Sequence, residues 1–449
     1  MKPNILIIQT DQQSLWTISA YKKQNYLQTH YIDSLAEEGA LSEHFYTNAN
    51  PCTPSRGCFL SGTYPNIHGA QANNQAIFQE VNTFAKVLKS NGYTTSYFGK
   101  YHLDGSLRPG WVHPDRGMGF TETNLMFNRG HFKKIIRFAP AQSNDQPNVF
   151  KEIGDEKSYT TDWLTHELID FINRNVNHPF LSMLSIPDPH NPYITRNPYQ
   201  SLFNPHEMTI PPSFHQDPSE LPPWINKKKF HINNIETLQK HKAAYSGMVK
   251  LIDDKVGDII SCLKAKNIYD QTIIIFTSDH GDYMGEHGLL SKNGMYESAY
   301  KIPFIIRYPP KIKPKSMHTF QWSTIDFCPT LLDLTDTSYS PGEFTGQSRA
   351  DLLVEQSTKT GGDDFIFIED QSLNPSEKGE VGIIGNEFWY AVNNSGFEVL
   401  FDRKSDPLQI NNKANNKELG ELKRYFLKKL IDHHSSIGSN HFKWLSQLI

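Results

Sequence analysis

The chain has 449 residues, and its 44 Lys plus Arg against 48 Asp plus Glu give a formal charge of −4 at pH 7. A charge this close to neutral argues against a protein that follows nucleic-acid phosphates, and a hydrophobic content of 37% is enough for a substantial core. No apolar run reaches the roughly 18 residues of a membrane helix, and the four cysteines are too scattered for a disulfide framework. We therefore expect a soluble globular chain with no nucleic-acid partner and no membrane span.

The first predicted element is a buried strand near the amino terminus, at residues 4–8 (Asn-Ile-Leu-Ile-Ile). The run is short, rich in branched residues and followed by polar ones, which is typical of a strand. It lacks the longer apolar core and the small-residue cleavage site of a secretory signal. The sequence as given favours a cytoplasmic location, or a periplasmic or secreted one if a signal was trimmed from it.

Further apolar strands alternate with helices along the chain. The strands are expected at residues 94–98, 179–186 and 272–277, and apolar residues at helical spacing over 248–263 predict an amphipathic helix before the last of them. Fully apolar strands that alternate with helices indicate a sheet covered on both faces. We therefore predict an α/β fold with a large, mainly parallel or mixed sheet sandwiched by helices.

The character of the sequence changes after about residue 357. Four short strand-like runs broken by Gly, Asn and Asp predict a small antiparallel sheet, and a helix is expected from Leu419 to about His433. The runs lie at residues 364–368, 381–384, 388–392 and 398–401. The sequence thus predicts an α/β domain over residues 1–357 and a C-terminal α+β subdomain over residues 358–449.

The first candidate site combines Asp11 with the pair Asp279 and His280. Each carboxylate follows closely on an apolar strand, and open parallel sheets place their sites at the carboxyl ends of strands. Two carboxylates and an imidazole suit a divalent cation, and Gln12 offers a neutral amide oxygen; such ligands favour Ca²⁺ or Mg²⁺ and leave Mn²⁺ open. The alternative is that both aspartates are turn or helix-cap residues.

The second candidate site is the segment 51–62, Pro-Cys-Thr-Pro-Ser-Arg-Gly-Cys-Phe-Leu-Ser-Gly. Cys52 lies in a proline-punctuated turn before a predicted helix, where helix amides favour an anion. The five residues between Cys52 and Cys58 are the wrong spacing for a redox Cys-x-x-Cys motif. We interpret Cys262 and Cys328 as core thiols.

Five blocks of the sequence resemble those of one enzyme family and occur in the same order. Cys52-Thr53-Pro54-Ser55-Arg56 resembles the C-x-P-S-R signature of type I sulfatases, in the alkaline-phosphatase superfamily. The other four blocks are residues 92–102, which resemble the second signature, 189–192 (the mid-chain histidine turn), 277–292 (the third block) and 399–407 (the C-terminal strand and turn). Phe98 departs from the second signature, where a smaller residue is usual.

The resemblance implies a modified cysteine and a metal. In the family the signature cysteine is oxidised to Cα-formylglycine, so a formylglycine-generating maturation enzyme is implied as a partner. A divalent metal is also implied, Ca²⁺ first, with Mn²⁺ or Mg²⁺ as alternatives. Carried over residue by residue, its ligands would be Asp11, Gln12, modified Cys52, Asp279 and His280. Many sulfatases have a second Asp where this chain has Gln12, and the Gln form also resembles choline sulfatases and phosphonate monoester hydrolases.

The remaining roles come from the same blocks. By resemblance, Arg56 would brace the formylglycine turn, and Lys100 and His102 would contact the modified residue. His190 and Lys292 would hold the transferring group, with His190 as proton donor to the departing alcohol. Asn73 is a weaker candidate for the same pocket, since a structural role suits it better.

The resemblance implies hydrolysis of a sulfate ester. In the family's chemistry the hydrated aldehyde attacks sulfur, and C–O cleavage then releases sulfate, with His102 taking the proton. A small sulfated saccharide is the expected substrate, because many members of the family act on glycans. Two alternatives remain open from the sequence. One is a phosphonate monoester or phosphodiester hydrolase of the same superfamily, and the other is a binding protein in which Cys52 is never oxidised.

Overall fold

The structure is a computed structural model. It describes residues 2–24, 26–106, 110–135, 152–225, 230–292, 294–355, 365–370 and 379–449. The predicted domain boundary between residues 357 and 358 lies outside the described residues, so it stays a prediction.

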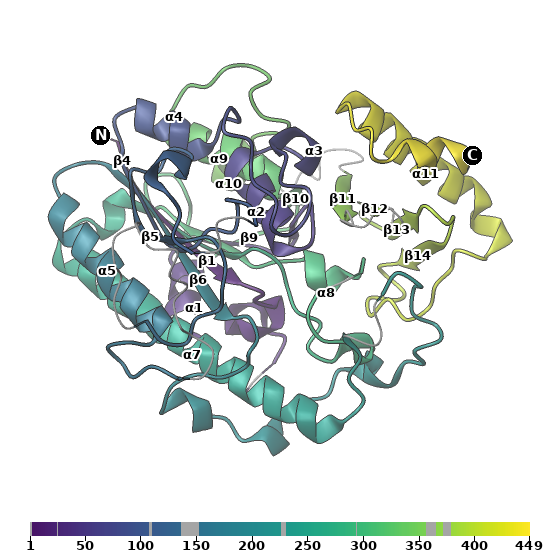
Figure 1. Cartoon of the computed structure of the whole chain (residues 1–449), viewed down its shortest axis with the longest axis horizontal. Coiled ribbons are helices and arrows are strands. Elements are labelled where there is room, and N and C mark those ends of the chain that lie inside the picture. Colours follow the sequence, from purple (N-terminus) through teal and green to yellow (C-terminus); the bar gives the residue numbers. More distant parts are fainter. Residues whose placement is uncertain are drawn as a thin grey trace.

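An eight-stranded sheet forms the centre of the larger part of the molecule (Figure 1). Its strand order is β5-β4-β6-β1-β7-β8-β2-β9, and all pairings are parallel except those of β8, which runs antiparallel to both neighbours. The strands are β1 (Asn4–Asp11), β2 (Ala40–Ser42), β4 (Thr94–Lys100), β5 (Glu122–Phe127), β6 (Phe180–Pro189), β7 (Thr272–Ser278), β8 (Phe304–Arg307) and β9 (Ser316–His318). The predicted strands are confirmed as β1, β4, β6 and β7. A separate parallel pair is formed by β3 (Phe45–Tyr46) and β10 (Trp322–Ser323).

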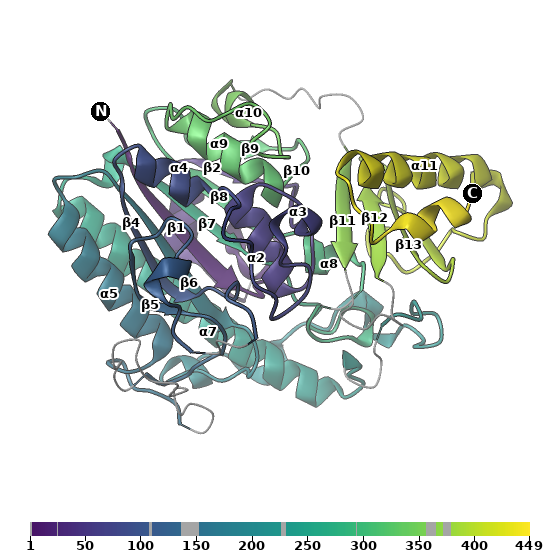
Figure 2. The same ribbon diagram turned by 45° about the horizontal axis from the view of Figure 1, so that its top comes forward.

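Helices cover both faces of this sheet (Figures 1 and 2). One face carries α1 (His30–Glu37), α5 (Thr160–Asn175) and α7 (Ile235–Ala265). The other carries α2 (Cys52–Ser61), α4 (Phe84–Ser90), α9 (Phe327–Leu334) and α10 (Ala350–Glu355). Two single-turn helices, α3 (Pro65–His68) and α8 (Glu297–Tyr300), lie in connections. The predicted α/β sandwich is confirmed.

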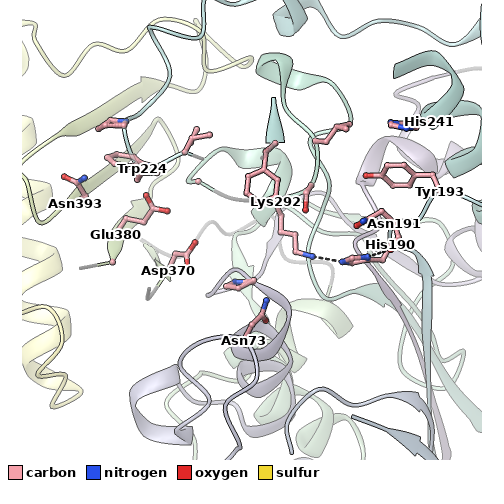
Figure 3. Close-up of a pocket in the computed structure, with 18 of the residues that line it drawn as sticks. Asn73, His190, Asn191, Tyr193, Trp224, His241, Lys292, Asp370, Glu380 and Asn393 are labelled. Atoms are coloured by element: carbon pink, nitrogen blue, oxygen red, sulfur yellow. Dashed lines mark hydrogen bonds between the residues drawn. The ribbon is translucent and has the colours of Figure 1, made fainter. Parts of the chain in front are cut away.

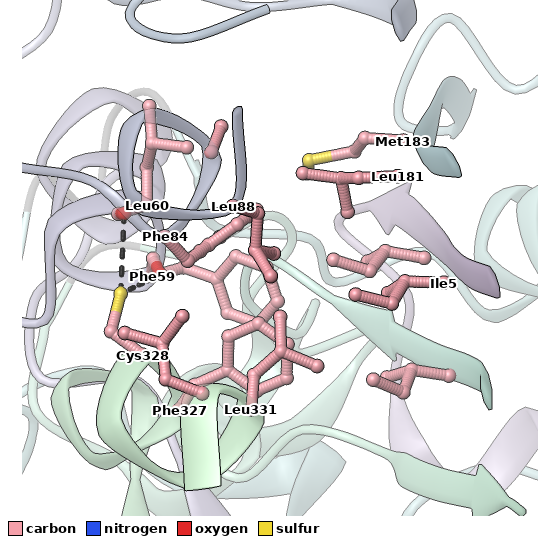
Figure 4. Close-up of a cluster of buried hydrophobic side chains, with 14 of the residues drawn as sticks. Ile5, Phe59, Leu60, Phe84, Leu88, Leu181, Met183, Phe327, Cys328 and Leu331 are labelled. Atoms are coloured by element: carbon pink, nitrogen blue, oxygen red, sulfur yellow. Dashed lines mark hydrogen bonds between the residues drawn. The ribbon is translucent and has the colours of Figure 1, made fainter. Parts of the chain in front are cut away.

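The apolar strands explain why both faces are covered. Successive side chains of a strand point to opposite faces, so Ile5 and Ile7 join one core cluster while Leu6 and Ile8 join the other. Figure 4 shows the first cluster, where Phe59, Phe84 and Phe327 come from three different helices and pack beside the sheet. Each strand must therefore bury both of its faces.

Helix α7 is longer than the sequence periodicity indicates, because the Asn234 side chain accepts the Thr237 backbone N–H and caps the helix well before residue 248. Cys328 is buried, as predicted, but Cys262 is only partly buried on α7, so it packs against the rim of the core. Between β6 and α7 the chain makes an excursion with three short 3-10 turns at Tyr199–Ser201, Pro205–Glu207 and Pro212–His215.

The C-terminal part is an antiparallel four-stranded sheet, as predicted. Its strands are β11 (Ile366–Asp370), β12 (Glu380–Ile384), β13 (Phe388–Asn393) and β14 (Glu398–Asp402), in that order. Helix α11 (Gly420–Ser436) covers one face. The other face packs on aromatic residues of the larger part, among them Tyr46 and Tyr300, so the two parts share a core cluster. Among the described residues, no helix combines the length and the apolar character needed to cross a bilayer.

Candidate active site

Four polar residues stand at the same edge of the main sheet. Asp11 and Lys100 are the last residues of β1 and β4, and His190 and Asp279 directly follow β6 and β7. These four strands are neighbours in the order β4-β6-β1-β7 and run parallel. The carboxyl ends of parallel strands meet at one edge of a sheet, and the strand order thus gathers residues that lie up to 268 positions apart, as the Thr10–Ser278 contact shows.

Cys52 joins this edge from the first position of α2. Its Sγ lies 3.0 Å from His280 Nε2 and 4.0 Å from Asp11 Oδ1. The ligand atoms of Asp11, Cys52, Asp279 and His280 are all buried and lie within 4.8 Å of one another. A helix amino terminus carries partial positive charge and favours an anionic group at Cys52.

The donor atoms of this cluster fit a divalent cation. His280 Nδ1 faces the Gly281 carbonyl oxygen at 3.0 Å and must donate to it, so the lone pair of Nε2 faces the cluster. Arg56 binds the Oδ2 atoms of Asp11 and Asp279 at 3.0 and 2.9 Å, whereas their Oδ1 atoms lie 3.9 and 3.6 Å from His280 Nε2. Two carboxylates and one imidazole nitrogen are ligands that Ca²⁺, Mg²⁺ or Mn²⁺ accepts. The predicted ligands other than Gln12 are thus brought together.

Gln12 has a fixed orientation next to this cluster. Its backbone, in the left-handed region with φ of 63°, donates to Asp279 Oδ1 at 2.9 Å. Its side-chain Nε2 donates to Asp282 Oδ2 at 2.5 Å, and its Oε1 accepts from Lys292 Nζ at 2.6 Å. The buried Asp282 was not singled out from the sequence, although it stands only three residues after Asp279 in the third block.

Arg56 is buried and supports the carboxylates. Besides Asp11 and Asp279, its guanidinium binds the Lys100 carbonyl oxygen and Ser185 Oγ, each at 2.8 Å. Arg56 therefore orients the carboxylates of Asp11 and Asp279, whereas the sequence resemblance predicts that it braces the turn at Cys52. It acts through these carboxylates as a positioning residue.

The two lysines create a positive field around Cys52. Burial by itself would raise the pKa of the Cys52 thiol, but Lys100 and Lys292 outweigh it and hold that pKa well below its ordinary value. Lys100 Nζ lies 3.8 Å from Cys52 Sγ and also binds Asp11. The site is therefore built to stabilise negative charge at the position of the Cys52 side chain.

His190 and His131 form a stacked pair at the entrance of this cluster. Their ring centroids are 3.5 Å apart with planes 5° from parallel. Lys292 Nζ lies 3.0 Å from His190 Nε2, and Lys100 Nζ lies 2.8 Å from His131 Nε2. Burial, and then Lys292, lower the pKa of His190 to about 4. The sequence does not indicate His131 as a site residue, because no motif surrounds it. Its stacking partner, His190, stands 59 positions later in the chain and meets it only in the folded structure.

His102 and Asn73 both accept hydrogen bonds from Thr53, the residue after Cys52. His102 Nε2 lies 3.4 Å from Asn74 Oδ1, to which it donates, so its buried Nδ1 carries the lone pair. Burial lowers the pKa of His102 to about 4, against the opposing effect of the Cys52 side chain. Asn73 Oδ1 accepts the Thr53 backbone N–H at 3.1 Å, which is a structural role, and Asn73 also lines the cavity described below.

A cavity of about 1300 Å³ is lined by His190, Lys292 and Asn73 and by residues of the C-terminal sheet (Figure 3). His190 and Lys292 stand on one side of it and Asp370 and Glu380 on the other. Trp224 and Tyr193 add aromatic rings to its wall. The cavity is large, and its wall is polar and apolar in about equal parts, which suits an organic ligand larger than a sulfate ion.

Comparisons with known proteins give a consistent result. The family model described as Sulfatase matches residues 3–337, and the one described as N-sulphoglucosamine sulphohydrolase, C-terminal, matches residues 285–436. The chain is 25% identical to an N-acetylglucosamine-6-O-sulfatase of Bacteroides thetaiotaomicron, over 98% of this chain and 87% of that protein.

Two solved structures share the fold. One, a complex with its substrate D-glucosamine-2-N,6-O-disulfate, has a TM-score of 0.82 at 22% identity and covers 98% of this chain and 99% of its own. The other is a phosphonate monoester hydrolase from Silicibacter pomeroyi, with a TM-score of 0.79 at 19% identity and 98% and 97% coverage.

Proposed function

The chain belongs to the sulfatase family and is a sulfuric ester hydrolase, and on this premise we propose that it removes sulfate from a sulfated carbohydrate. We propose further that Cys52 works as formylglycine, made by a maturation enzyme, and that Asp11, Gln12, Asp279 and His280 hold a divalent cation with it, Ca²⁺ first. The observation that carries this proposal is the position of Cys52, buried at a helix amino terminus between two lysines and beside three metal-ligand side chains.

Formylglycine at position 52 would supply a hydrated aldehyde as nucleophile, and the divalent cation would supply a Lewis acid that polarises the ester oxygens. The chain's own residues prepare the site for them. Lys100 and Lys292 supply the fixed positive charge that an anionic sulfate ester needs in the transition state. Arg56 keeps Asp11 and Asp279 oriented by binding the oxygens that point away from the cluster.

Two histidines are placed to move protons. His190 Nδ1 faces the Asn191 carbonyl oxygen at 2.7 Å and donates to it, so Nε2 faces Lys292 as an acceptor. An anionic ester bound at Lys292 would offset the lysine's charge and raise the pKa of His190, which then can hold a proton for the leaving alcohol. His102 has a buried Nδ1 with a free lone pair, and its side chain interacts with that of Cys52, so it suits the role of proton acceptor.

The size and lining of the cavity support a saccharide substrate. Trp224 and Tyr193 can stack on sugar rings. One relative is an N-acetylglucosamine-6-O-sulfatase, and one structure with the same fold is a complex with D-glucosamine-2-N,6-O-disulfate, which adds support of the same kind. The second candidate is a phosphonate monoester or phosphodiester hydrolase. One observation favours this second candidate. Gln12 places a neutral amide next to the cluster, at a position where many sulfatases have a charged Asp.

The decisive experiment compares activity with the fraction of aldehyde at Cys52. Preparations of differing maturation are analysed by mass spectrometry of the Cys52 peptide and assayed on matched aryl sulfate, phosphate diester and phosphonate esters. A panel of sulfated saccharides follows. We expect sulfate release in proportion to the aldehyde fraction and none from Cys52→Ala. Full turnover with an unmodified thiol would refute the proposal, and preference for the phosphorus esters would favour the second candidate.

A further inference from the structure

Two carboxylates face each other on the C-terminal sheet. Asp370 ends β11 and Glu380 begins β12, and the two are direct partners in the antiparallel register. Side chains of directly opposed residues stand on the same face about 4.5–5.5 Å apart at Cβ, and like charges in this arrangement are destabilising. The stability of the sheet therefore does not explain why two carboxylates stand opposite each other here.

The described chain supplies no positive partner for this pair. Among the described residues, burial and the neighbouring Asp370 raise the pKa of Glu380 well above its ordinary value, and burial raises that of Asp370 to about 7. Glu380 is only 6% exposed, yet its Oε2 has no hydrogen-bond partner. The neighbouring titratable groups are Tyr283 and Tyr300, neither of which is a cation.

The pair lines the same cavity as His190, Lys292 and Asn73 of the candidate active site. Figure 3 shows Asp370 and Glu380 on the side of the C-terminal sheet, with Lys292 and His190 across the cavity from them. Trp224 lines the same wall as the pair, and its buried Nε1 also has no hydrogen-bond partner. The wall opposite Lys292 and His190 therefore presents an unpaired Glu380 oxygen and an aromatic ring to the same cavity.

We propose that Asp370 and Glu380 form a subsite for a protonated amino group of the sugar. The ammonium group would compensate the repulsion between the two carboxylates and donate charge-assisted hydrogen bonds to their oxygens, whereas a hydroxyl group or a second sulfate brings no compensating charge. The cavity is thereby divided by charge. Lysines hold the sulfate that is removed, and the carboxyl pair holds a cationic substituent of the ring. This inference rests on the proposed function.

The test measures kcat/KM of the matured enzyme on pairs of saccharides that differ only by a second sulfate, together with matched hydroxyl and free-amine analogues. We expect the wild type to prefer the free-amine analogue to its hydroxyl and second-sulfate counterparts by about 10-fold or more, the contribution of one hydrogen bond between charged groups. Glu380→Gln and Asp370→Asn should reduce this ratio several-fold, mainly through KM. Glu380→Asp keeps the charge and should keep most of the preference. The amine analogue distinguishes ion pairing from hydroxyl recognition.

A matched control is Glu387→Gln, because Glu387 is an exposed carboxylate on the turn after the far end of β12. It should leave the ratio unchanged. Thermal unfolding of each variant checks that it folds. We expect both amide variants to fold, because each removes the repulsion between two buried carboxylates. An unchanged ratio in both amide variants would refute the subsite, and so would a wild type that does not prefer the free-amine analogue. Release of sulfate from no saccharide at all would instead refute the carbohydrate function on which the subsite depends.

Discussion

Arg56→Ala tests whether the guanidinium holds the two carboxylates of the candidate metal site together. Arg56 is 3% exposed and donates to Asp11 Oδ2 at 3.0 Å and to Asp279 Oδ2 at 2.9 Å. Both carboxylates are fully buried. The substitution leaves Lys100 as the lysine bound to Asp11 and removes the only guanidinium that the described structure places on Asp279.

The expected loss follows from the energetics of buried ion pairs. Removing one partner leaves an uncompensated buried charge, which costs about 3–5 kcal/mol. Burial, and then the charge of Asp11, already raise the pKa of Asp279. Asp279 will therefore take up a proton more readily in the variant, which limits the loss to the lower part of that range. We expect the free energy of unfolding to fall by about 3 kcal/mol.

The assay is urea unfolding at pH 7 in the presence of a chelator, with Arg174→Ala as control. Arg174 also pairs with a carboxylate, Glu122 at 2.8 Å, but at an exposed position, so its loss should cost less than about 1 kcal/mol. Adding a divalent cation at about 100 times its dissociation constant should return about 2.7 kcal/mol to a protein that still binds it. If Arg56→Ala costs no more than Arg174→Ala, the guanidinium does not organise these carboxylates.

Three further predictions concern the same site and the subsite. Asp279→Ala should abolish sulfate release and the thermal stabilisation that added Ca²⁺ gives, and unchanged turnover would remove Asp279 from the site. Gln12→Asp adds a carboxylate and should tighten Ca²⁺ binding in calorimetry; an unmoved affinity would place Gln12 outside the ligand set. The folded state keeps protons on Asp370 and Glu380 that the unfolded chain loses near pH 4, so stability should fall as pH rises from about 4 through 7, by up to about 1.4 kcal/mol per pH unit per proton. Glu380→Gln should flatten this slope in thermal unfolding at pH 5 and 8, and an equal slope in variant and wild type would contradict the assignment.

The sequence by itself determined the local elements and the residue types of the centre. The apolar runs predicted β1, β4, β6 and β7, because a strand buried on both faces needs apolar residues at every position. Asp11 and Asp279, which follow two of these runs, marked the edge of the sheet where a site is expected, whereas Lys100 was indicated only by the resemblance of its segment to the family's second signature. The segment around Cys52 carried its own signature.

Only the tertiary structure decided which of these residues meet. Hydrophobic periodicity fixes the faces of strands and helices, but it does not state which strands are neighbours, and the order β4-β6-β1-β7 places Lys100, His190, Asp11 and Asp279 side by side. The stacking of His131 on His190 has no trace in the sequence, since it joins two connections whose positions depend on separate strands. The same holds for Asp370 and Glu380, which are two of many acidic residues until the antiparallel register pairs them and the packing of the C-terminal sheet turns them toward the cavity. Contacts between elements far apart in the chain arise from the packing of whole layers, and a single sequence specifies that packing only through the sum of many weak interactions.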